Sequence, residues 1–215
     1  MMEISVVDYG SGNLRSVAKA IERSMAEADI LGQVRVTADR GHIQNSDRIV
    51  LPGVGAFADC QAGIRAIPGL WQVLDDAVKI QGKPLLGICV GMQLLSEVGH
   101  EFGDTPGFGW VKGEVRMISP SDKGLKIPHM GWNNLIFCDQ PHPLLDGIKE
   151  GAHAYFVHSF AFQCTNPAGQ LVSVDYGGPI TAAVGQGNVV GTQFHPEKSQ
   201  AVGLRFLTNF LKWKP

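Results

Sequence analysis

Cys89 is the residue whose sequence surroundings most clearly indicate chemistry. A short apolar run over residues 84–88 leads into the pattern Gly87-x-Cys89-x-Gly91. This pattern is typical of a buried strand that turns sharply into a helix, the arrangement known as a nucleophile elbow. Glycines on both sides remove the Cβ atoms that would crowd such a crossing. We therefore predict a nucleophilic thiol at this turn.

The helix expected after Cys89 would assist a thiol in two ways. The free N–H groups and the dipole at a helix start favour a thiolate. The N–H of Val90, directly after the nucleophile, is placed to donate to an oxyanion. Met92, Leu95 and Val98 continue an apolar pattern with helical spacing. The alternative is an ordinary core cysteine, because free cysteines are most often buried.

A second chemical pattern is the tripeptide His195-Pro196-Glu197, which follows a short apolar run. On an extended backbone, residues two apart point to the same side, so His195 and Glu197 could face one site. A histidine oriented by a carboxylate is the general base that a thiol nucleophile needs. Taken alone, the tripeptide could equally be a surface turn with no catalytic role.

The composition excludes several other classes of protein. The chain has 215 residues, a formal net charge of −2 and no cluster of lysines or arginines, so it shows no footprint for nucleic acid. It has no apolar run of about 20 residues, so no membrane span is predicted. The amino terminus lacks the pattern of a signal peptide. The histidines and the four widely spaced cysteines form no metal-type cluster, so we expect reduced thiols, no bound metal and a cytoplasmic location.

The first half of the chain alternates between strands and helices. Strands are expected at residues 3–9, 33–38, 48–51 and 84–88, and helices at residues 14–25 and 64–80, the latter with breaks near Pro68 and Gly69. This alternation predicts an α/β fold with a mostly parallel, doubly wound sheet and flanking helices. Function in such sheets gathers at the carboxyl ends of the strands, where residues 52–55 and Cys89 both lie.

The second half has a different character. Short β-type runs are expected at residues 109–118, 126–137, 154–162, 171–176, 180–185 and 188–194, and a final helix at 199–213. We interpret the runs as mainly antiparallel strands that extend the same sheet system. No linker or repeat interrupts the chain, so a single domain over residues 1–215 is expected.

Taken together, the cysteine and histidine motifs resemble those of the class I glutamine amidotransferase family. The resemblance covers nearly the whole chain, and its motifs lie at residues 8–13, 51–55, 87–93, 128–133, 155–160 and 192–197. The segments at 87–93 and 192–197 mark the family. The motifs within residues 51–55, 128–133 and 155–160 are similar to those of glutaminase subunits that supply ammonia to a separate cyclase subunit.

The resemblance implies roles for particular residues. It implies a catalytic triad of Cys89, His195 and Glu197. It also implies an oxyanion site, a glutamine site and a partner surface. The residues of the implied oxyanion site are Gly53, Val54, Gly55 and Val90, and those of the implied glutamine site are Gln93, Ser159 and Phe160. The residues of the implied partner surface are Asn13, Pro128, His129, Met130, Gly131 and Trp132. Phe160 is often tyrosine in relatives, a change that we expect to be tolerated because backbone contacts dominate there.

The activity implied by the resemblance is hydrolysis of glutamine to glutamate and ammonia, with no cofactor. The ammonia would pass, within a heterodimer, to a barrel-shaped cyclase subunit that forms imidazole glycerol phosphate and an aminoimidazole carboxamide nucleotide in histidine synthesis. One alternative is a glutaminase that feeds another synthase, in nucleotide-sugar amidination or in pyridoxal phosphate synthesis. Residues 130–133 argue against the pyridoxal version. Another alternative is a regulatory binding protein on an inactive scaffold, which the intact triad disfavours.

Overall fold

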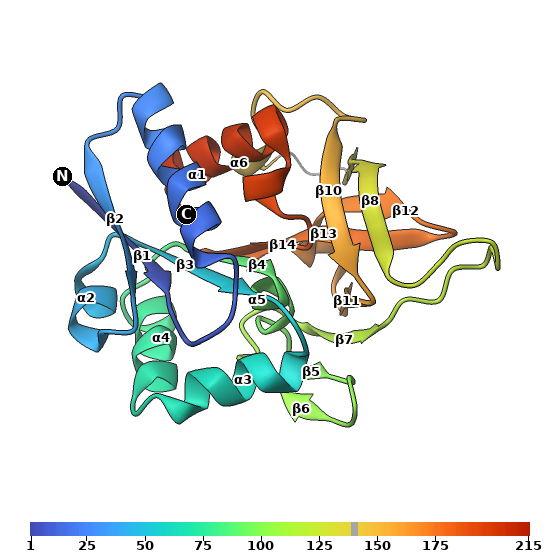
Figure 1. Cartoon of the computed structure of the whole chain (residues 1–215), viewed down its shortest axis with the longest axis horizontal. Helices are drawn as coiled ribbons and strands as arrows, with labels where there is room; N and C mark the ends of the chain where they lie inside the picture. Colours follow the sequence, from blue (N-terminus) through green and yellow to red (C-terminus); the bar gives the residue numbers. More distant parts are fainter. Residues whose placement is uncertain (139–141) are drawn as a thin grey trace.

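An eight-stranded sheet runs through the centre of the computed structural model, which describes residues 1–138 and 142–215 (Figure 1). Its strand order is β2-β1-β3-β4-β14-β13-β12-β9. The strands are β1 (Met2–Val7), β2 (Gly32–Thr37), β3 (Arg48–Gly53), β4 (Leu85–Cys89), β9 (Ile136–Phe137), β12 (Gln170–Asp175), β13 (Pro179–Gln186) and β14 (Val189–Thr192). Neighbours from β2 to β14 are parallel, whereas β13, β12 and β9 are added antiparallel. The predicted α/β sheet with an antiparallel extension is thus confirmed.

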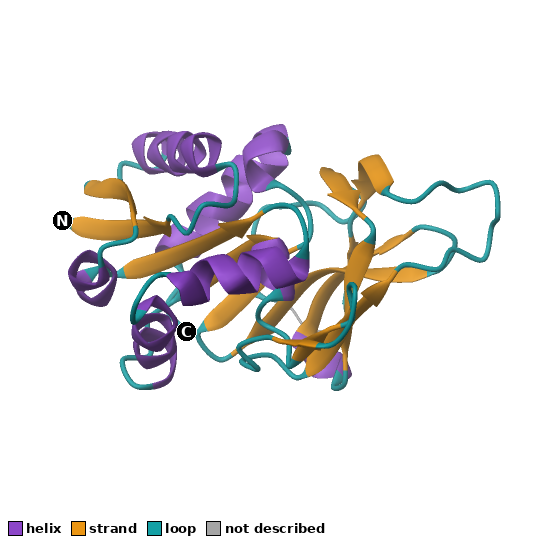
Figure 2. Ribbon diagram, turned by 60° about the horizontal axis from the view of Figure 1, so that its bottom comes forward, coloured by secondary structure: helices purple, strands orange, loops and turns teal. Residues whose placement is uncertain are grey.

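Helices cover both faces of the parallel part of the sheet. α1 (Leu14–Glu27) packs against α6 (Gln200–Lys212) on one side, while α2 (Arg40–Asn45), α3 (Phe57–Ala66) and α4 (Leu70–Lys79) lie on the other (Figures 1 and 2). Every residue of β3 and β4 is consequently buried. Burial on both faces explains why residues 49–51 and 85–88 are continuous apolar runs rather than alternating ones.

The helices differ from the prediction in two places. The helix expected over 64–80 begins earlier, at Phe57. The breaks expected near Pro68 and Gly69 are present, because α3 ends before Pro68 and Gly69 has a left-handed φ of 78° ahead of α4. The short helix α2 was not predicted. Its cap is Asp39, whose Oδ1 accepts a hydrogen bond of 2.8 Å from the His42 N–H.

Two smaller sheets contradict the expectation that all later strands extend one sheet. β10 (His153–His158) pairs with β8 (His129–Asn134), and a four-stranded sheet has the order β11-β7-β5-β6. Its strands are β5 (Val98–Gly99), β6 (Thr105–Pro106), β7 (Gly113–Met117) and β11 (Phe160–Cys164). The run expected over 154–162 changes sheets at Ser159. An apolar pattern that continues through such a break does not reveal a change of partner strand.

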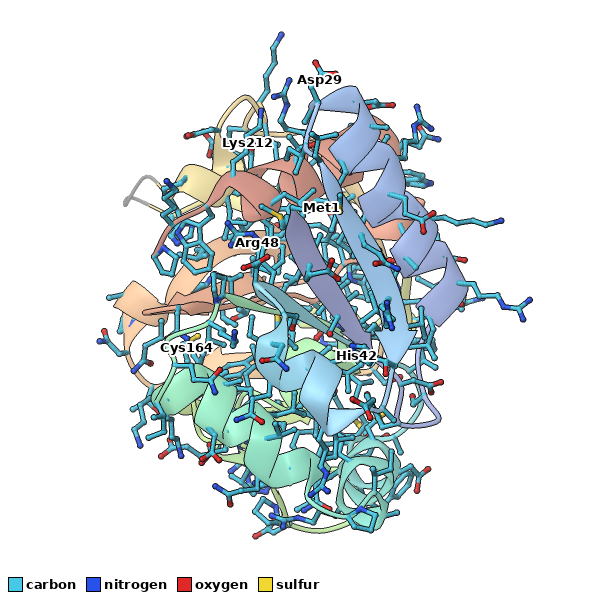
Figure 3. All side chains as sticks on the ribbon, turned by 90° about the vertical axis from the view of Figure 1, so that its left-hand side faces the viewer. Met1, Asp29, His42, Arg48, Cys164 and Lys212 are labelled. Carbon is cyan, nitrogen blue, oxygen red and sulfur yellow. The ribbon has the colours of Figure 1, made fainter. Side chains whose placement is uncertain are left out.

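The carboxyl-terminal helix is tied to the start of β3 by Arg48. Its Nε donates to the carbonyl of Leu211 at 3.0 Å and its Nη2 to that of Trp213 at 2.7 Å. Arg48 and Lys212, the last residue of α6, are both labelled in Figure 3. A cation at a helix carboxyl terminus satisfies carbonyls that lack helical partners. Among the described residues, no helix is both long and apolar enough to cross a membrane.

Candidate active site

Cys89 sits at a strained turn between β4 and the short helix α5 (Val90–Gln93). Its φ of 56° and ψ of −114° are unusual for a residue with a side chain, and such strain is often found at functional sites. A Cβ on Gly87 would lie 2.5 Å from the Gly91 carbonyl oxygen, and a Cβ on Gly91 would overlap the carbonyl oxygen of Leu51. The structure therefore contains the predicted turn and shows why both flanking residues are glycine.

The helix after Cys89 is much shorter than predicted. The carbonyls of Leu94, Leu95 and Ser96 accept hydrogen bonds from residues 107–111 instead of continuing the helix. Val98, expected on the helix, begins β5. One turn of helix has a small dipole, so the expected stabilisation of a thiolate by the helix dipole is weak here. Support for a thiolate must come from side chains and local N–H groups.

His195 and Glu197 form a buried pair. The Nδ1 of His195 lies 2.8 Å from the Oε1 of Glu197, and their side chains are 3% and 1% exposed. The Nδ2 of Asn13 donates to the same carboxylate oxygen at 3.4 Å. Residues 196–198 form a 3-10 turn, so the extended backbone expected between the two residues is wrong at Glu197. The two side chains nevertheless meet, because the turn brings the carboxylate back under the ring.

The electrostatics of this pair favour a charged imidazole. Burial by itself would lower the pKa of His195, but the nearby Cys89 sulfur and the bonded Glu197 carboxylate outweigh burial and raise the pKa to about 9. Burial would raise the pKa of Glu197, yet the bond and charge of His195 lower it overall. Because Glu197 occupies Nδ1, Nε2 is the ring nitrogen left to exchange a proton with Cys89. The arrangement suits an imidazolium between a thiolate and a carboxylate.

A cavity of about 330 Å³ brings most of the predicted site residues together. Cys89 and His195 line it from β4 and the turn after β14. The other lining residues are Asn13, Val54, Gly55, Val90, Gln93, Glu101, Pro128, Val157, His158, Ser159, Phe160 and Lys198. Glu197 and Gly53 do not line the cavity: Glu197 contacts the Nδ1 of His195, and Gly53 lies against Tyr9 and Gly91. The size of the cavity suits a small polar molecule rather than a macromolecule.

Sequence reasoning missed several residues of this cavity. Glu101 adds a carboxylate, and its Oε2 accepts a hydrogen bond of 2.8 Å from the Phe57 N–H. Lys198 adds a cation, and His158 adds a neutral ring, because burial lowers its pKa to about 4. Only Lys198, next to Glu197, could have been found by its spacing. Glu101 and His158 reach the cavity from β-rich segments whose pairing the sequence does not reveal.

The segment expected to form the oxyanion site is held by the loop that follows β1. The N–H of Val54 donates to the Ser11 Oγ at 3.0 Å, and this hydroxyl donates back to the Val54 carbonyl at 2.7 Å. The Cys60 Sγ also donates to that carbonyl, at 3.3 Å. In this conformation the Val54 N–H is therefore engaged by Ser11. Gly55, next to Val54, has a φ of 90°. Because glycine has no Cβ, the peptides of this segment can change orientation at low cost.

The residues expected on the partner surface divide between the two faces of β8. Met130 and Trp132 are 63% and 48% exposed. His129 is only 2% exposed, and its ring stacks on Phe156 and Tyr176. Successive side chains of a strand point to opposite faces, so His129 cannot share the outer face with its neighbours. The expectation that His129 lies on the surface is wrong.

Within residues 1–138 and 142–215, no group of three or more histidine, cysteine, aspartate or glutamate side chains is placed to hold a metal ion. The cavity itself offers side chains and backbone N–H groups that can take part in a reaction. It combines a nucleophilic sulfur, a base oriented by a carboxylate, and polar groups around a small cavity. Such a set is suited to acyl transfer.

Comparison with known proteins identifies the class. The family model described as "Glutamine amidotransferase class-I" matches residues 5–213. A solved glutamine amidotransferase structure superposes with a TM-score of 0.71 at 18% identity, covering 97% of both chains. The chain therefore belongs to the class I glutamine amidotransferase family.

Two curated relatives are more specific than the family model and are similar to this chain over its full length. The imidazole glycerol phosphate synthase subunit HisH of Rhodospirillum rubrum is 54% identical over 214 residues, and that of Mesorhizobium japonicum is 54% identical over 217 residues. Both matches cover 100% of this chain and 100% of the relative. The similarity thus extends over the entire length of both proteins.

Proposed function

We propose that this chain is the glutaminase subunit of imidazole glycerol phosphate synthase. It hydrolyses glutamine to glutamate and ammonia and passes the ammonia to a cyclase subunit. The observation that carries this proposal is Cys89, held in a strained turn at a small cavity beside the buried His195–Glu197 pair. The full-length identity of 54% to HisH subunits supports the choice of synthase.

The proposed reaction begins with attack of the Cys89 sulfur on the side-chain amide carbon of glutamine. A tetrahedral intermediate forms, and His195 donates a proton to the departing ammonia. The product of this step is a glutamyl thioester. His195 then removes a proton from water, which attacks the thioester and releases glutamate. Glu197 orients the imidazole and stabilises its cation throughout, through the bond to Nδ1.

Stabilisation of the tetrahedral oxyanion requires N–H donors that point into the cavity. The N–H of Val90 follows the nucleophile directly and is one candidate. The N–H of Val54 is the second, but it donates to Ser11 in the present conformation. We infer that the Gly53–Val54 peptide must turn before the oxyanion site is complete. The chain alone is therefore a slow glutaminase.

The cavity offers complementary groups for a free amino acid. Glu101 provides a carboxylate for the α-ammonium group of glutamine. Gln93, Ser159 and Phe160 line the same cavity and provide further polar atoms. A buried ammonium group needs a charged or polar partner, because burying it unpaired is costly. This requirement favours an amino acid over a simple amide as the substrate.

A partner is required by the chemistry of the product. Free ammonia is protonated in bulk water and loses its nucleophilicity, so an acceptor site must be close by. The exposed Met130 and Trp132 on β8 provide apolar area on a face near the cavity, which Pro128 also lines. Exposed aromatic side chains are common anchors of protein interfaces. We assign this face, together with Asn13, to the cyclase subunit.

The proposal is tested by measuring glutamate release from glutamine in three mixtures: the chain alone, with the histidine-pathway cyclase, and with the cyclase and its nucleotide substrate. Strong activation in the third mixture is expected. Activity that is unaffected by this cyclase would keep the glutaminase but assign it to another synthase. Absence of glutamate in all three mixtures would contradict the proposed activity.

A further inference from the structure

The carbonyl oxygen of Phe160 fixes the direction of a buried hydrogen-bond network. It accepts from the Gln93 Nε2 at 3.1 Å and from the His158 Nδ1 at 2.8 Å. A backbone carbonyl can only accept, so both side-chain atoms must be donors. The amide orientation of Gln93 and the tautomer of His158 are thereby determined by one atom of the main chain.

One branch of the network leads from Gln93 to the nucleophile. The Nε2 of Gln93 also donates to the Oε1 of Gln193, at 3.0 Å. With its oxygen occupied as an acceptor, Gln193 must present its NH₂ group on the other side, and this Nε2 lies 3.7 Å from the Cys89 Sγ. That distance is appropriate for a bond to sulfur, whose radius is larger than that of oxygen. Gln193 is fully buried, so water does not compete for these atoms.

The other branch keeps the network neutral. His158 donates through Nδ1, so its Nε2 is the acceptor, at 3.0 Å from the His129 Nδ1. The Nε2 of His129 in turn lies 3.3 Å from the Nδ2 of Asn133, which donates to it. Burial lowers the pKa of both rings to about 4. Neither histidine therefore carries a charge that would compete with the His195 imidazolium for the thiolate.

We propose that Gln193 is a further catalytic residue, whose amide N–H donates a hydrogen bond to the Cys89 thiolate, in a direction set by the Phe160 carbonyl through Gln93. A neutral donor stabilises the thiolate without adding a second cation beside His195. The short helix α5 makes such a donor valuable, because little helix dipole is available. The proposal rests on the proposed glutaminase function and adds a residue to its nucleophile.

The network also restricts how Gln93 can bind glutamine. Its two amide hydrogens are directed at the Phe160 carbonyl and at Gln193. The Oε1 remains for a ligand, so Gln93 would act as an acceptor, toward the amide or ammonium hydrogens of the substrate. A carboxylate at its place could accept in the same way but could not donate to the Phe160 carbonyl.

The test measures the reactivity of the Cys89 thiolate without glutamine or a partner. The chain is treated with iodoacetamide at pH 7, and alkylation of each cysteine is followed by peptide mass spectrometry. In Gln193→Met, which has a similar length but no donor, the alkylation rate of Cys89 should fall about tenfold. The half-buried Cys138 and Cys164 serve as internal references and should react at their wild-type rates.

Two further variants make the result decisive. Thr192→Val changes the residue next to Gln193 and removes a buried hydrogen bond from the Thr192 hydroxyl to the Phe194 carbonyl. It should leave alkylation of Cys89 unchanged. Gln193→Glu keeps an acceptor for Gln93 but places a carboxylate oxygen beside the sulfur, so it should slow alkylation at least as much as the methionine. Gln193→Glu therefore provides the test if Gln193→Met does not fold. A Cys89 rate within twofold of wild type in either folded variant would overturn the proposal.

The outcome is separable from that of the proposed function, because alkylation needs no glutaminase activity. Slow alkylation in the Gln193 variants, with no glutamate release by the wild-type complex, would support the role of Gln193 and refute the glutaminase. Normal alkylation of Cys89 in the Gln193 variants, together with full glutaminase activity of the wild-type complex, would refute the role of Gln193 and support the glutaminase.

Discussion

The parallel half of the central sheet and the β8–β10 pair are built in opposite ways. β3 and β4 are buried along their whole length, and the glycines beside Cys89 are in such close contact that no side chain would fit. β8 alternates between buried and exposed residues, with Trp132 half exposed and His129 enclosed. The first region has one possible packing, whereas the second has an open face.

In the proposed function, this difference separates the catalytic residues from the surface that binds the cyclase. The nucleophile needs a fixed position, and a close-packed strand crossing supplies it. A surface that must bind another protein needs accessible apolar side chains. The Gly53–Val54–Gly55 segment is intermediate between the two regions, since it ends a rigid strand but is held at Val54 by hydrogen bonds to the side chains of Ser11 and Cys60. The following predictions test whether the two regions are as separable as the structure suggests.

Cys89→Ala should have the largest effect. Removing the nucleophile should reduce glutamine hydrolysis by at least about a thousandfold, because the thioester can no longer form. Synthesis from added ammonium salt, assayed with the cyclase and its nucleotide, should be unchanged. Loss of both activities would show that the chemistry and the partner surface are not separate.

Gly91→Ala should damage the rigid region most. Its Cβ would overlap the Leu51 carbonyl oxygen in β3, so the free energy of unfolding should fall by about 3 kcal/mol. Urea unfolding measures this value. Gly41→Ala in α2, where the nearest atom is a flexible carboxylate oxygen of Asp39, is the matched control and should change stability by less than about 1 kcal/mol. Equal effects would contradict the packing argument.

Trp132→Ala should affect the open face alone. A central aromatic anchor contributes about 2 kcal/mol to binding, which corresponds to roughly thirtyfold weaker assembly with the cyclase. Because the side chain is half exposed, the melting temperature should hardly change. Calorimetric titration with the cyclase gives the affinity. Unchanged affinity and unchanged activation would show that Trp132 has only a structural role on β8.

Ser11→Ala tests the Gly53–Val54–Gly55 segment, which Ser11 holds through Val54. Losing the hydroxyl frees the Val54 N–H, so the peptide can turn toward the oxyanion at lower cost. One such hydrogen bond corresponds to about a fivefold gain in the glutaminase rate of the chain without its partner. Ser11→Thr keeps the hydroxyl and should behave like the wild type. A slower basal rate in Ser11→Ala would contradict this account of the resting state.

The last prediction concerns the dependence of the free energy of unfolding on pH. The pKa of His195 is raised from 6.5 in the unfolded chain to about 9 in the folded one. Its contribution to stability is therefore complete below about pH 6.5 and is lost as the pH rises through about 9. Urea unfolding at pH 6 to 10 should show this decline, and His195→Gln should reduce it. An equal decline in that variant would assign the effect to other groups.

The fold class and the chemical centre could be predicted from the sequence because both are local patterns. The apolar run ending in Gly87-x-Cys89-x-Gly91 specifies a strand and a turn within a few residues. The short length of α5 could not be predicted, because it depends on residues 107–111 binding the carbonyls that a longer helix would use. Likewise, Glu101 and His158 line the cavity only because strands that are distant in the sequence bring them there.

The network around Phe160 shows the same limit. Gln193 is only two residues before His195, yet nothing in its spacing indicates that it faces the sulfur of Cys89. Its orientation follows from a carbonyl on β11 and an amide on α5, which meet only in three dimensions. Hydrogen-bond direction is a property of the assembled site, so the sequence motif identifies the region but not this residue.

The most direct test of the central claim is to capture the intermediate on Cys89. The chain with the cyclase and its nucleotide would be quenched in acid during glutamine turnover, and its peptides analysed by mass spectrometry. The account predicts a glutamyl thioester on the peptide that contains Cys89, and no such adduct in Cys89→Ala. Full glutamine turnover without an adduct on Cys89, or with the adduct on another residue, would contradict it.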